Sequence, residues 1–311
     1  MINPSRLIPQ ADCSKAASLR SSGPPAQDSP CLERKKEYLS RKDEDLRQKC
    51  ASLSVIFPAF NEEEGIRTLV EFARRVLPEL AETWEIIVVD DGSQDATGAI
   101  CDELAAEHPE MCTIHHPTNL GYGAALKSGI IAAKHDLIFF TDSDGQFDLK
   151  ELRQLIRWSD EYQVVAGYRK KRRDPPHRLV NALAWNVLVR ILLGIKVRDI
   201  DCAFKLFHRE VFNHVQIRSV GAMVNTEILA QATRLGMRMH EVEVTHFPRQ
   251  HGKPSGANVR VILKAFRELI RLGGHLRRVP QGQTGLVSNR RALIGPAVQP
   301  ITREQSAHMR L

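Results

Sequence analysis

The sequence lacks several features that mark particular classes of protein. No apolar run reaches the roughly 18–20 residues of a membrane-spanning helix, and the nearest, Leu179–Ile195, contains Asn181, Asn186 and Arg190. We therefore interpret that run as an amphipathic or buried helix. The N-terminus has no apolar signal core, so export is not expected. The 6 cysteines form no CxxC pair and accompany no paired histidines, which argues against zinc and favours a reduced, cytosolic chain.

The bulk composition is that of a globular protein. The chain has 311 residues, of which 42% are hydrophobic and 26% charged, enough for one large domain or two small ones. Its net charge of +7 is unevenly placed, because residues 51–249 carry −5 and residues 250–311 carry +9. The basic C-terminal end predicts an encounter with an anionic surface.

Composition divides the chain into four parts. Residues 1–50 are rich in Ser, Pro and mixed charge, as in "SSGPPAQDSP", and are predicted to be disordered apart from a short charged helix at Glu33–Lys49. Residues 51–256 are predicted to form the folded domain. Residues 257–279 are predicted to form a basic amphipathic helix, and residues 280–311 a flexible tail.

Apolar runs alternate with helical patterns in the folded domain. "LSVIF", "EIIVVD", "CTIHH" and "DLIFFTD" predict four buried strands, and residues 61–77, 96–107 and 124–133 between them have helical spacing. This order predicts an α/β fold with a doubly wound, mostly parallel sheet flanked by helices. Polar residues follow three of the strands, at the edge where such sheets bind ligands; they are residues 58–62, 90–95 and 142–146.

Two common phosphate-binding motifs do not fit these strand ends. A dinucleotide fold requires GxGxxG after the first strand, but that turn reads "PAFNEEEG", with glutamates that would repel a pyrophosphate. "GYGAALKSG" (Gly121–Gly129) has Leu126 where a phosphate loop needs glycine before Lys127. We predict instead that Gly121–Gly129 is a helix packed closely on the sheet through its small residues.

The stretch "FFTDSDGQFD" (Phe139–Asp148) places three carboxylates directly after a buried strand. Carboxylates that close repel one another and are costly to desolvate. A divalent cation resolves the conflict, and Mg²⁺ or Mn²⁺ prefers few protein carboxylates when a substrate phosphate completes its shell. We therefore predict that Asp142 and Asp144 form two walls of a metal–diphosphate site. The alternative is a solvated acidic turn.

Several motifs together carry a family resemblance. "SVIFPAFNEEEGI", "IIVVDDGSQDAT", "NLGYGAALKSGI" and "TDSDGQ" resemble the successive motifs of family 2 glycosyltransferases, which have the GT-A fold. "VAGYRKKR", the segment from His177 to Phe212 and "EVEVTHFPRQHGKPSG" are similar to the polyprenol-phosphate sugar synthases, the dolichyl-phosphate mannose synthase group. The order and spacing of the motifs match from Leu53 to Gly256.

The resemblance implies roles for individual residues. It implies a nucleoside pocket lined by Pro58, Phe60, Glu62, Val89 and Asp91, where the family usually has tyrosine at Phe60. It implies that Asp142, Ser143 and Asp144 contact ribose, diphosphate and metal, with Gln146 as a further metal ligand. The residues implied in catalysis and in holding the two phosphates are Asp144, Arg169, Arg178, Asp199, Glu227 and Arg249. Asp199 and Asp201 precede "CAF", where the family commonly has "SGF".

The resemblance also implies an activity: inverting transfer of a hexose, mannose or glucose, from a GDP- or UDP-sugar to a polyprenol phosphate. Relatives that glycosylate hydroxyls commonly carry Glu-Asp, whereas Glu227 has no following aspartate, and a phosphate acceptor needs no strong base because its second pKa is near ~6. A saccharide or soluble hydroxyl acceptor, and a silent nucleotide-sugar binding protein, remain the alternatives.

The basic amphipathic helix suggests how such an enzyme reaches a lipid. In "NVRVILKAFRELIRL" the apolar residues form one face and the basic residues the other. Such a helix can lie among lipid headgroups or pack on the protein itself. We therefore expect an anionic membrane surface as a peripheral partner, on the cytoplasmic side, and no nucleic acid.

Overall fold

The structure is a computed structural model. It describes residues 49–169, 187–190, 192–195, 197–248, 268–274 and 276, and all of these belong to one unit, Leu46–Leu311. The predicted disordered N-terminal segment with its helix at Glu33–Lys49, the C-terminal tail and most of the predicted amphipathic helix lie outside the described residues, so the predicted domain boundaries stay predictions. Among the helices that are described, none is long and apolar enough to cross a membrane.

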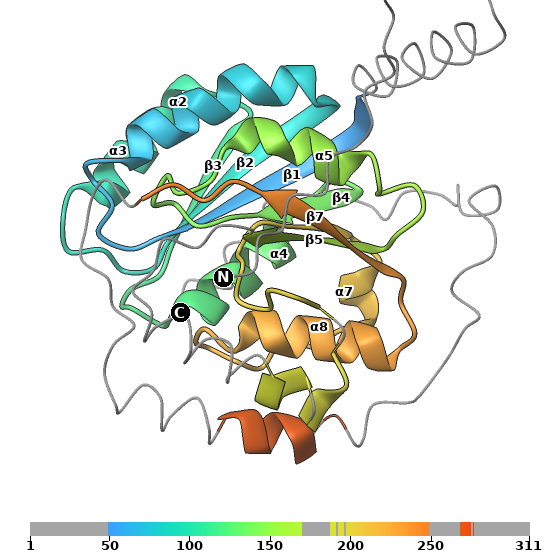
Figure 1. Ribbon diagram of the computed structural model, residues 1–311. Coiled ribbons are helices and arrows are strands. Elements are labelled where there is room, and N and C mark those ends of the chain that lie inside the picture. Colours follow the sequence, from blue (N-terminus) through green and yellow to red (C-terminus); the bar gives the residue numbers. More distant parts are fainter. Residues whose placement is uncertain are drawn as a thin grey trace, which may run out of the picture. The chain divides into compact units, whose positions relative to one another are not determined.

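The described strands form one seven-stranded sheet in the order β3-β2-β1-β4-β6-β5-β7 (Figure 1). β6 runs antiparallel to both its neighbours, and all the other pairs are parallel. The strands are β1 (Cys50–Ala59), β2 (Ala81–Asp90), β3 (Met111–His115), β4 (Leu137–Phe140), β5 (Val164–Arg169), β6 (Lys205–His208) and β7 (Met239–Val244). The four predicted strands are therefore confirmed as β1 to β4, and the predicted doubly wound, mostly parallel sheet is confirmed with them.

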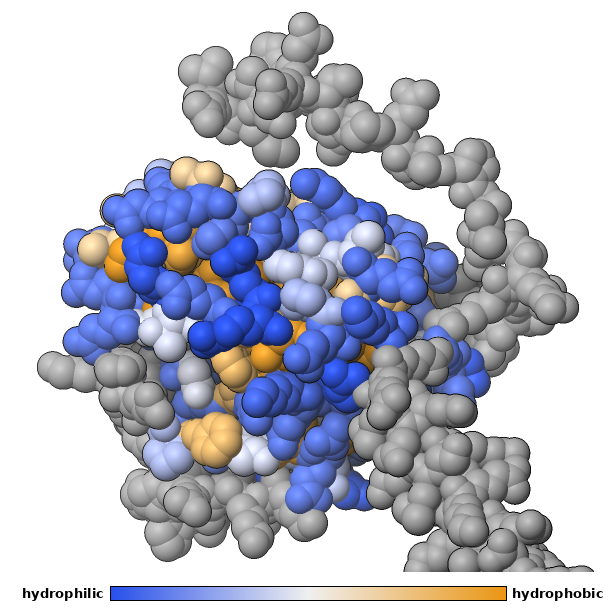
Figure 2. Space-filling model, turned by 90° about the horizontal axis from the view of Figure 1, so that it is seen from above, coloured by the Kyte–Doolittle hydropathy of each residue, from blue (hydrophilic) through white to orange (hydrophobic). Residues whose placement is uncertain are grey.

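Helices cover both faces of this sheet, as predicted. α2 (Ile66–Val76), α3 (Thr97–Glu107) and α5 (Leu152–Ile156) pack on one face, and α4 (Tyr122–Ala132), α7 (Val211–His214) and α8 (Val224–Arg234) pack on the other (Figure 1). Short 3₁₀ turns at Leu77–Glu79 and Leu149–Glu151 precede β2 and α5. Seen from the side of α2 and α3, the surface is mostly hydrophilic, with apolar side chains showing only in places (Figure 2).

The central strands are apolar on both faces because both faces are covered. All residues from Leu53 to Ala59 and from Glu85 to Asp90 are buried, and alternate residues of β1 join different core clusters: Val55 and Phe57 one, Ile56 the other. Continuous apolar runs, instead of alternating ones, are typical of parallel strands enclosed in this way. This is why β1, β2 and β4 could be predicted from the sequence as buried strands.

The Gly121–Gly129 stretch is a helix packed closely on the sheet, which confirms the prediction for it. A Cβ atom added to Gly129 would lie 2.4 Å from Cγ2 of Ile56 on β1. Gly121 has a φ of 103° and Gly123 donates its N–H to the carbonyl of Val220 at 2.9 Å. Small residues therefore let α4 approach both the sheet and the loop before α8.

Only a short part of the predicted amphipathic helix is described, at residues 268–274 and 276. Leu269, Leu272 and Leu276 are buried in the core cluster on the α4 and α8 side, whereas Ile270 is 74% exposed. This turn of the helix therefore packs on the protein through its leucines. The basic residues predicted to face a membrane lie largely in the preceding segment, outside the described residues.

Candidate active site

The register of the sheet brings three polar strand ends together. Pro58 of β1 pairs with Val89 of β2, and Ile56 pairs with Phe140 of β4. Asp91 then donates its backbone N–H to Ala59 O at 2.8 Å, and Thr141 donates to Ile56 O at 3.3 Å. The loops after β2 and β4 therefore leave the sheet on either side of the end of β1, at the edge where parallel α/β sheets bind ligands.

The loop after β4 has two partly exposed carboxylates, Asp142 and Asp144. Burial, together with the negative charge of Asp144, raises the pKa of Asp142 to about 6. Asp144 Oδ1 accepts the backbone N–H of Gln146 at 3.1 Å, which closes a turn through Gly145 at a φ of 69°. Gln146 Nε2 in turn donates to the carbonyl of Phe247 at 2.9 Å.

This donor set fits a hard divalent cation. Asp142 and Asp144 supply carboxylate oxygens, and the bond from Gln146 Nε2 to Phe247 fixes the amide so that its oxygen is the atom left for a cation. Mg²⁺ and Mn²⁺ prefer oxygen ligands and commonly take part of their shell from substrate phosphates. Burial and the charge of Asp144 raise the pKa of Asp142. A bound divalent cation would favour the charged form of this carboxylate and so offset both effects. In the described residues no cluster of three or more His, Cys, Asp or Glu forms an all-protein cage.

Ser143 and Val89 are placed behind the site. Ser143 is buried and its hydroxyl donates to the carbonyl of Pro58 at 2.8 Å, which ties the loop after β4 to β1. Val89 is fully buried in the core under α4. Both side chains contact the protein, and the ligand contacts implied for these two residues stay predictions. They support the site from behind.

Asp91 organises the loop that leads into α4. Its carboxylate accepts the N–H groups of Leu120 at 3.0 Å and Gly121 at 2.8 Å, and it contacts Nδ1 of His116 at 2.6 Å. His116 contacts Ser128 on α4 through its other ring nitrogen at 2.9 Å. Asp91 is 3% exposed, so the residue implied as a nucleoside ligand already has three partners within the protein.

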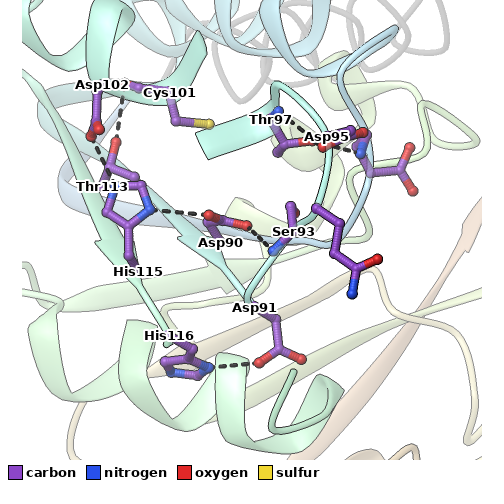
Figure 3. A network of polar contacts seen from close by, with 12 residues as sticks. Asp90, Asp91, Ser93, Asp95, Thr97, Cys101, Asp102, Thr113, His115 and His116 are labelled. Atoms are coloured by element: carbon purple, nitrogen blue, oxygen red, sulfur yellow. Dashed lines mark hydrogen bonds and ion pairs between the residues drawn. The ribbon is translucent and has the colours of Figure 1, made fainter. Parts of the chain in front are cut away.

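Asp90 lies beside Asp91 but points to the opposite side (Figure 3). It accepts the N–H of Ser93 at 3.0 Å and contacts His115 Nδ1 at 3.0 Å, while Asp102 contacts His115 Nε2 at 2.8 Å. Burial raises the pKa of Asp90, but the bonds from Ser93 and His115 outweigh it and lower that pKa. Burial likewise lowers the pKa of His115, and the two aspartates outweigh it and raise that pKa.

The His115 bridge predicts a pH-dependent contribution to stability. A raised folded-state pKa means that this stabilisation is complete below about pH 6.5, the ordinary histidine value, and is lost as the pH rises through the folded-state pKa. We expect His115→Gln to lower the melting temperature most in mildly acidic buffer and progressively less in alkaline buffer. His214→Gln, at an exposed position in α7, is the control. A deficit that is constant from about pH 5 to pH 9 would contradict the charged bridge.

Hydrogen bonds join the loop after β1 to the loop after β2. Asn61, at a φ of 54°, donates its N–H to Ser93 Oγ at 2.9 Å and accepts the N–H of Gln94 at 2.8 Å. Glu62 donates its N–H to Thr97 Oγ1 at 2.8 Å. Acidic side chains join the same two loops, since Asp95 accepts the N–H of Glu63 at 3.3 Å and Glu63 accepts the N–H of Ala96 at 2.9 Å. Phe60, between these contacts, is 41% exposed and is available to contact a ligand.

Arg169 and Asp199 form a buried ion pair beside the site. Arg169 Nε and Nη2 donate to the two carboxylate oxygens of Asp199 at 2.7 and 2.8 Å, with the two side chains 11% and 8% exposed. Burial opposes the charge of the guanidinium, but Asp199 outweighs that effect and raises the pKa of Arg169. The charges of Arg169 and Lys205 both lower the pKa of Asp142, so the pair contributes to the electrostatics of the carboxylate loop.

Glu227 holds the loop that precedes α8. It is 2% exposed, and its Oε2 accepts the backbone N–H groups of Arg218 at 2.9 Å and Ser219 at 2.8 Å. The loop that it holds continues to Val220, whose carbonyl accepts from Gly123 at the start of α4. Glu227 is a positioning residue for this loop.

Sequence reasoning missed three polar residues that are linked to Asp142 directly or through a neighbour: Lys205, Tyr122 and Asn225. Lys205 is fully buried and donates from Nζ to the carbonyls of Ile200 and Cys202, while burial lowers its pKa. The Tyr122 side chain lies beside Asp142 and Asn225. A lysine inside the apolar run "FKLF" was the sequence signal for Lys205. Arg178 and Arg249 lie outside the described residues, so their implied contacts with phosphate stay predictions.

The fold and the carboxylate loop agree with comparison to known protein families. The model of glycosyl transferase family 2 matches residues 54–216. The chain therefore belongs to glycosyl transferase family 2, as the motifs predicted. The match includes the second half of β1, all of β2 to β4, the acidic loops after β1, β2 and β4, and the Arg169–Asp199 pair.

Curated relatives include polyprenol-phosphate sugar transferases. Polyprenol monophosphomannose synthase of Mycolicibacterium smegmatis is 32% identical over 221 residues, which is 66% of this chain and 82% of the relative. Dolichyl-phosphate beta-glucosyltransferase ALG5A of Trichomonas vaginalis is 31% identical over 212 residues, 62% and 64% of the two chains. Glycosyltransferase AglD of Haloferax volcanii is 34% identical over 231 residues, 70% of this chain but only 36% of the relative. This chain thus matches about a third of one relative and most of another.

A solved structure supports the GT-A fold. Glucosyl-3-phosphoglycerate synthase from Mycobacterium tuberculosis, in complex with Mn²⁺, UDP and its product, matches with a TM-score of 0.55. The match covers 75% of this chain and 82% of that one, at 20% identity. The GT-A-like fold predicted for the chain is confirmed.

Proposed function

We propose that the chain is an inverting, metal-dependent hexosyltransferase that moves a sugar from a nucleotide sugar to a polyprenol phosphate. The observation that carries the choice of acceptor is Glu227, which is buried and whose Oε2 accepts the backbone N–H groups of both Arg218 and Ser219. It is therefore not placed to remove a proton. A phosphate monoester needs no such base at neutral pH, because its second pKa is near ~6. Two of the relatives are named for polyprenol or dolichyl phosphate.

The reaction is one displacement at the anomeric carbon. An oxygen of the acceptor phosphate forms the new bond, the bond to the donor diphosphate breaks, and the nucleoside diphosphate leaves with the bonding electrons. Mg²⁺ or Mn²⁺, when bound, offsets negative charge on that leaving group, and Asp142, Asp144 and Gln146 would hold it. Arg169, held by Asp199, adds a fixed positive charge nearby, and fixed charge of this kind is usually the largest catalytic contribution.

The donor is proposed to be a GDP- or UDP-hexose, with mannose or glucose as the sugar. Phe60 is proposed to contact the nucleoside, and its exposure directly after β1 supports this role. Pro58, Glu62 and Asp91 take part in hydrogen bonds of the loops around it. Arg178 and Arg249 are proposed to hold the two phosphates. One displacement inverts the anomeric centre, and the name of the Trichomonas relative specifies a beta linkage.

Acceptor choice gives the direct test. With a short-chain polyprenol phosphate, we expect sugar transfer at neutral pH, and with the matching unphosphorylated polyprenol we expect none above background. The physical reason is that only the phosphate is already an anionic nucleophile. Radiolabelled product extracted into organic solvent measures both. Equal rates on the phosphate and the alcohol would instead favour a hydroxyl acceptor.

Glu227 provides a second test. Glutamine at this position keeps a side-chain oxygen that can accept from Arg218 and Ser219, so Glu227→Gln should retain transfer within about threefold, whereas removing a general base costs about 10²–10⁴-fold. Glu227→Ala leaves those N–H groups without an acceptor and should lower the free energy of unfolding by about 1–3 kcal/mol. Initial rates and urea denaturation measure the two effects. A loss of more than about 100-fold in Glu227→Gln with an unchanged fold would identify Glu227 as a base.

We further propose peripheral association with an anionic membrane, which is where a polyprenol phosphate resides. The support is the net charge of +9 over residues 250–311, because clustered Lys and Arg are attracted to anionic headgroups. The described turn at residues 268–274 packs on the protein through Leu269 and Leu272, so this proposal rests on charge and on the exposed Ile270.

A further inference from the structure

The segment that follows β7 is fastened to the carboxylate loop. Phe247 donates its backbone N–H to the carbonyl of Gln146 at 2.8 Å, and its own carbonyl accepts from Gln146 Nε2 at 2.9 Å. His246 forms an isolated antiparallel bridge with Phe147, and the centroids of their rings lie 5.2 Å apart. Two successive residues of this segment therefore hold two successive residues of the carboxylate loop.

The ring of Phe247 is exposed on this support. Both bonds to Gln146 use backbone atoms of Phe247, so the ring takes no part in them, and the exposed fraction of the residue is 43%. Thr245, two positions earlier, donates its N–H and its hydroxyl to the Glu151 carboxylate at 2.7 and 2.8 Å, which steadies the same segment. A single exposed apolar side chain is ordinary on a protein surface. This one differs because a fixed backbone presents it beside Gln146, a proposed metal ligand.

The order of the strands puts Phe247 across the carboxylate loop from the proposed nucleoside site. β4 has β1 on one side and β6, β5 and β7 on the other. The loop after β4 is tied to β1 by the bond from Ser143 to Pro58, and to the segment after β7 through Gln146. Phe60, the proposed nucleoside contact, directly follows β1. In an inverting displacement the acceptor approaches the anomeric carbon from the face opposite the leaving group, so the sugar and the acceptor are the parts of the substrates expected on the β7 side.

The chemistry of the ring selects between the sugar and the acceptor. A phenylalanine ring is a large apolar surface without the polar group that tyrosine and tryptophan carry, and covering apolar surface is favourable in proportion to its area. A hexose presents hydroxyl groups around its ring. A polyprenol phosphate carries a long hydrocarbon chain directly after its phosphate, so the chain is the better match.

We propose that Phe247 contacts the hydrocarbon chain of the polyprenol phosphate and is a specificity-determining residue for the acceptor. This inference rests on the proposed function and deepens it, because it assigns a residue to the apolar part of the acceptor. The bonds between Phe247 and Gln146 then place that contact next to the loop that holds the donor diphosphate.

Phe247→Ser tests the proposal, because it removes the apolar ring and keeps the backbone bonds to Gln146. The acceptors are isopentyl phosphate and farnesyl phosphate, which carry the same phosphate on a short and a long apolar chain. We expect the KM for farnesyl phosphate to rise about five- to tenfold through the lost apolar contact. The value of kcat should stay within about twofold, because the ring does not act on the reacting atoms. The rise in KM should be smaller with isopentyl phosphate, which offers less apolar surface.

Two control variants and two further measurements isolate contact with the acceptor. Phe247→Leu keeps an apolar side chain and should recover most of the affinity for farnesyl phosphate. Ile131→Ser removes an apolar side chain that is 68% exposed in the last turn of α4, and it should leave the KM unchanged. Titration calorimetry with Mn²⁺ measures binding of UDP, UDP-glucose, GDP and GDP-mannose. We expect Phe247→Ser to change neither this binding nor the melting temperature.

The outcomes separate this inference from the proposed function. An unchanged KM for farnesyl phosphate in Phe247→Ser overturns the inference and leaves the proposed function standing. An equal rise with both acceptors overturns it as well, since the effect would not depend on apolar surface. Weaker binding of a nucleotide sugar with unchanged binding of its nucleoside diphosphate overturns it by placing the ring against the hexose, and a lower melting temperature overturns it by showing that the ring packs on the protein. A wild-type chain that transfers sugar to neither acceptor overturns the proposed function along with it.

Discussion

Asp144→Asn should abolish metal-dependent sugar transfer and leave the fold intact or slightly more stable. The asparagine keeps Oδ1, which accepts the N–H of Gln146 and closes the turn at Gly145. It removes the charge that, after burial, raises the pKa of Asp142, so repulsion within the loop falls. The cation, however, loses a charged ligand. With several kcal/mol of charge stabilisation at stake, about 10²–10⁴-fold of the rate should be lost.

Asp148→Asn is the matched control for that experiment. Asp148 is the third carboxylate of the same loop, but its Oδ1 accepts the N–H of Lys150 and caps the short turn at Leu149–Glu151. Asparagine is an equally good cap, so we expect wild-type transfer and wild-type stability. Rates with Mn²⁺, Mg²⁺ and EDTA, together with thermal denaturation, distinguish the two positions. Normal turnover by Asp144→Asn, or equal loss in both variants, would refute the assignment of the cation to Asp142 and Asp144.

The contrast between Asp144 and Asp148 shows what the sequence could and could not predict about the site. The carboxylates could be placed at the end of a buried strand, because "DLIFF" is a continuous apolar run and the polar residues follow it directly. Which carboxylate caps a turn depends on the path of the backbone after Gly145. Asp91 and His116 illustrate the same limit, since they lie 25 positions apart and meet only because β2 and β3 are paired.

The second half of the sheet was harder to predict than the first. β1, β2 and β4 contain continuous buried runs and therefore appear as apolar runs in the sequence, whereas β7 contains Glu241 and Glu243 and is only partly buried. β6 has four residues and is antiparallel between β4 and β5. Its position depends on pairing with strands about 40 and 65 residues earlier, which no local pattern specifies. The buried Lys205 at its start is accommodated by the carbonyls of Ile200 and Cys202, and these too are set by tertiary structure.

The Arg169–Asp199 pair predicts the largest effect on stability. Asp199→Ala leaves the guanidinium of Arg169 buried without its partner, and breaking a buried pair in this way costs about 3–5 kcal/mol. For a domain of this size that is about 6–20 °C in melting temperature. Arginine keeps its proton in proteins, so Arg169 cannot avoid this cost by losing a proton, although the variant lacks the aspartate that raises its pKa.

A double replacement separates the structural role of this pair from its chemical role. Arg169→Met combined with Asp199→Leu removes both charges and keeps apolar volume, and replacing a buried ion pair by apolar groups is often neutral for stability. We therefore expect the double variant to recover most of the melting temperature lost in Asp199→Ala. Transfer should remain at least about tenfold below wild type, because the fixed positive charge beside the carboxylate loop is gone.

Thermal denaturation and initial rates measure both effects. They are compared among the wild type, the single variants Arg169→Met and Asp199→Ala, and the double variant. If the double variant is as unstable as Asp199→Ala, an unpaired charge is not the cause of the instability. If it recovers full activity along with its stability, the pair serves the fold alone and the charge of Arg169 has no part in the reaction.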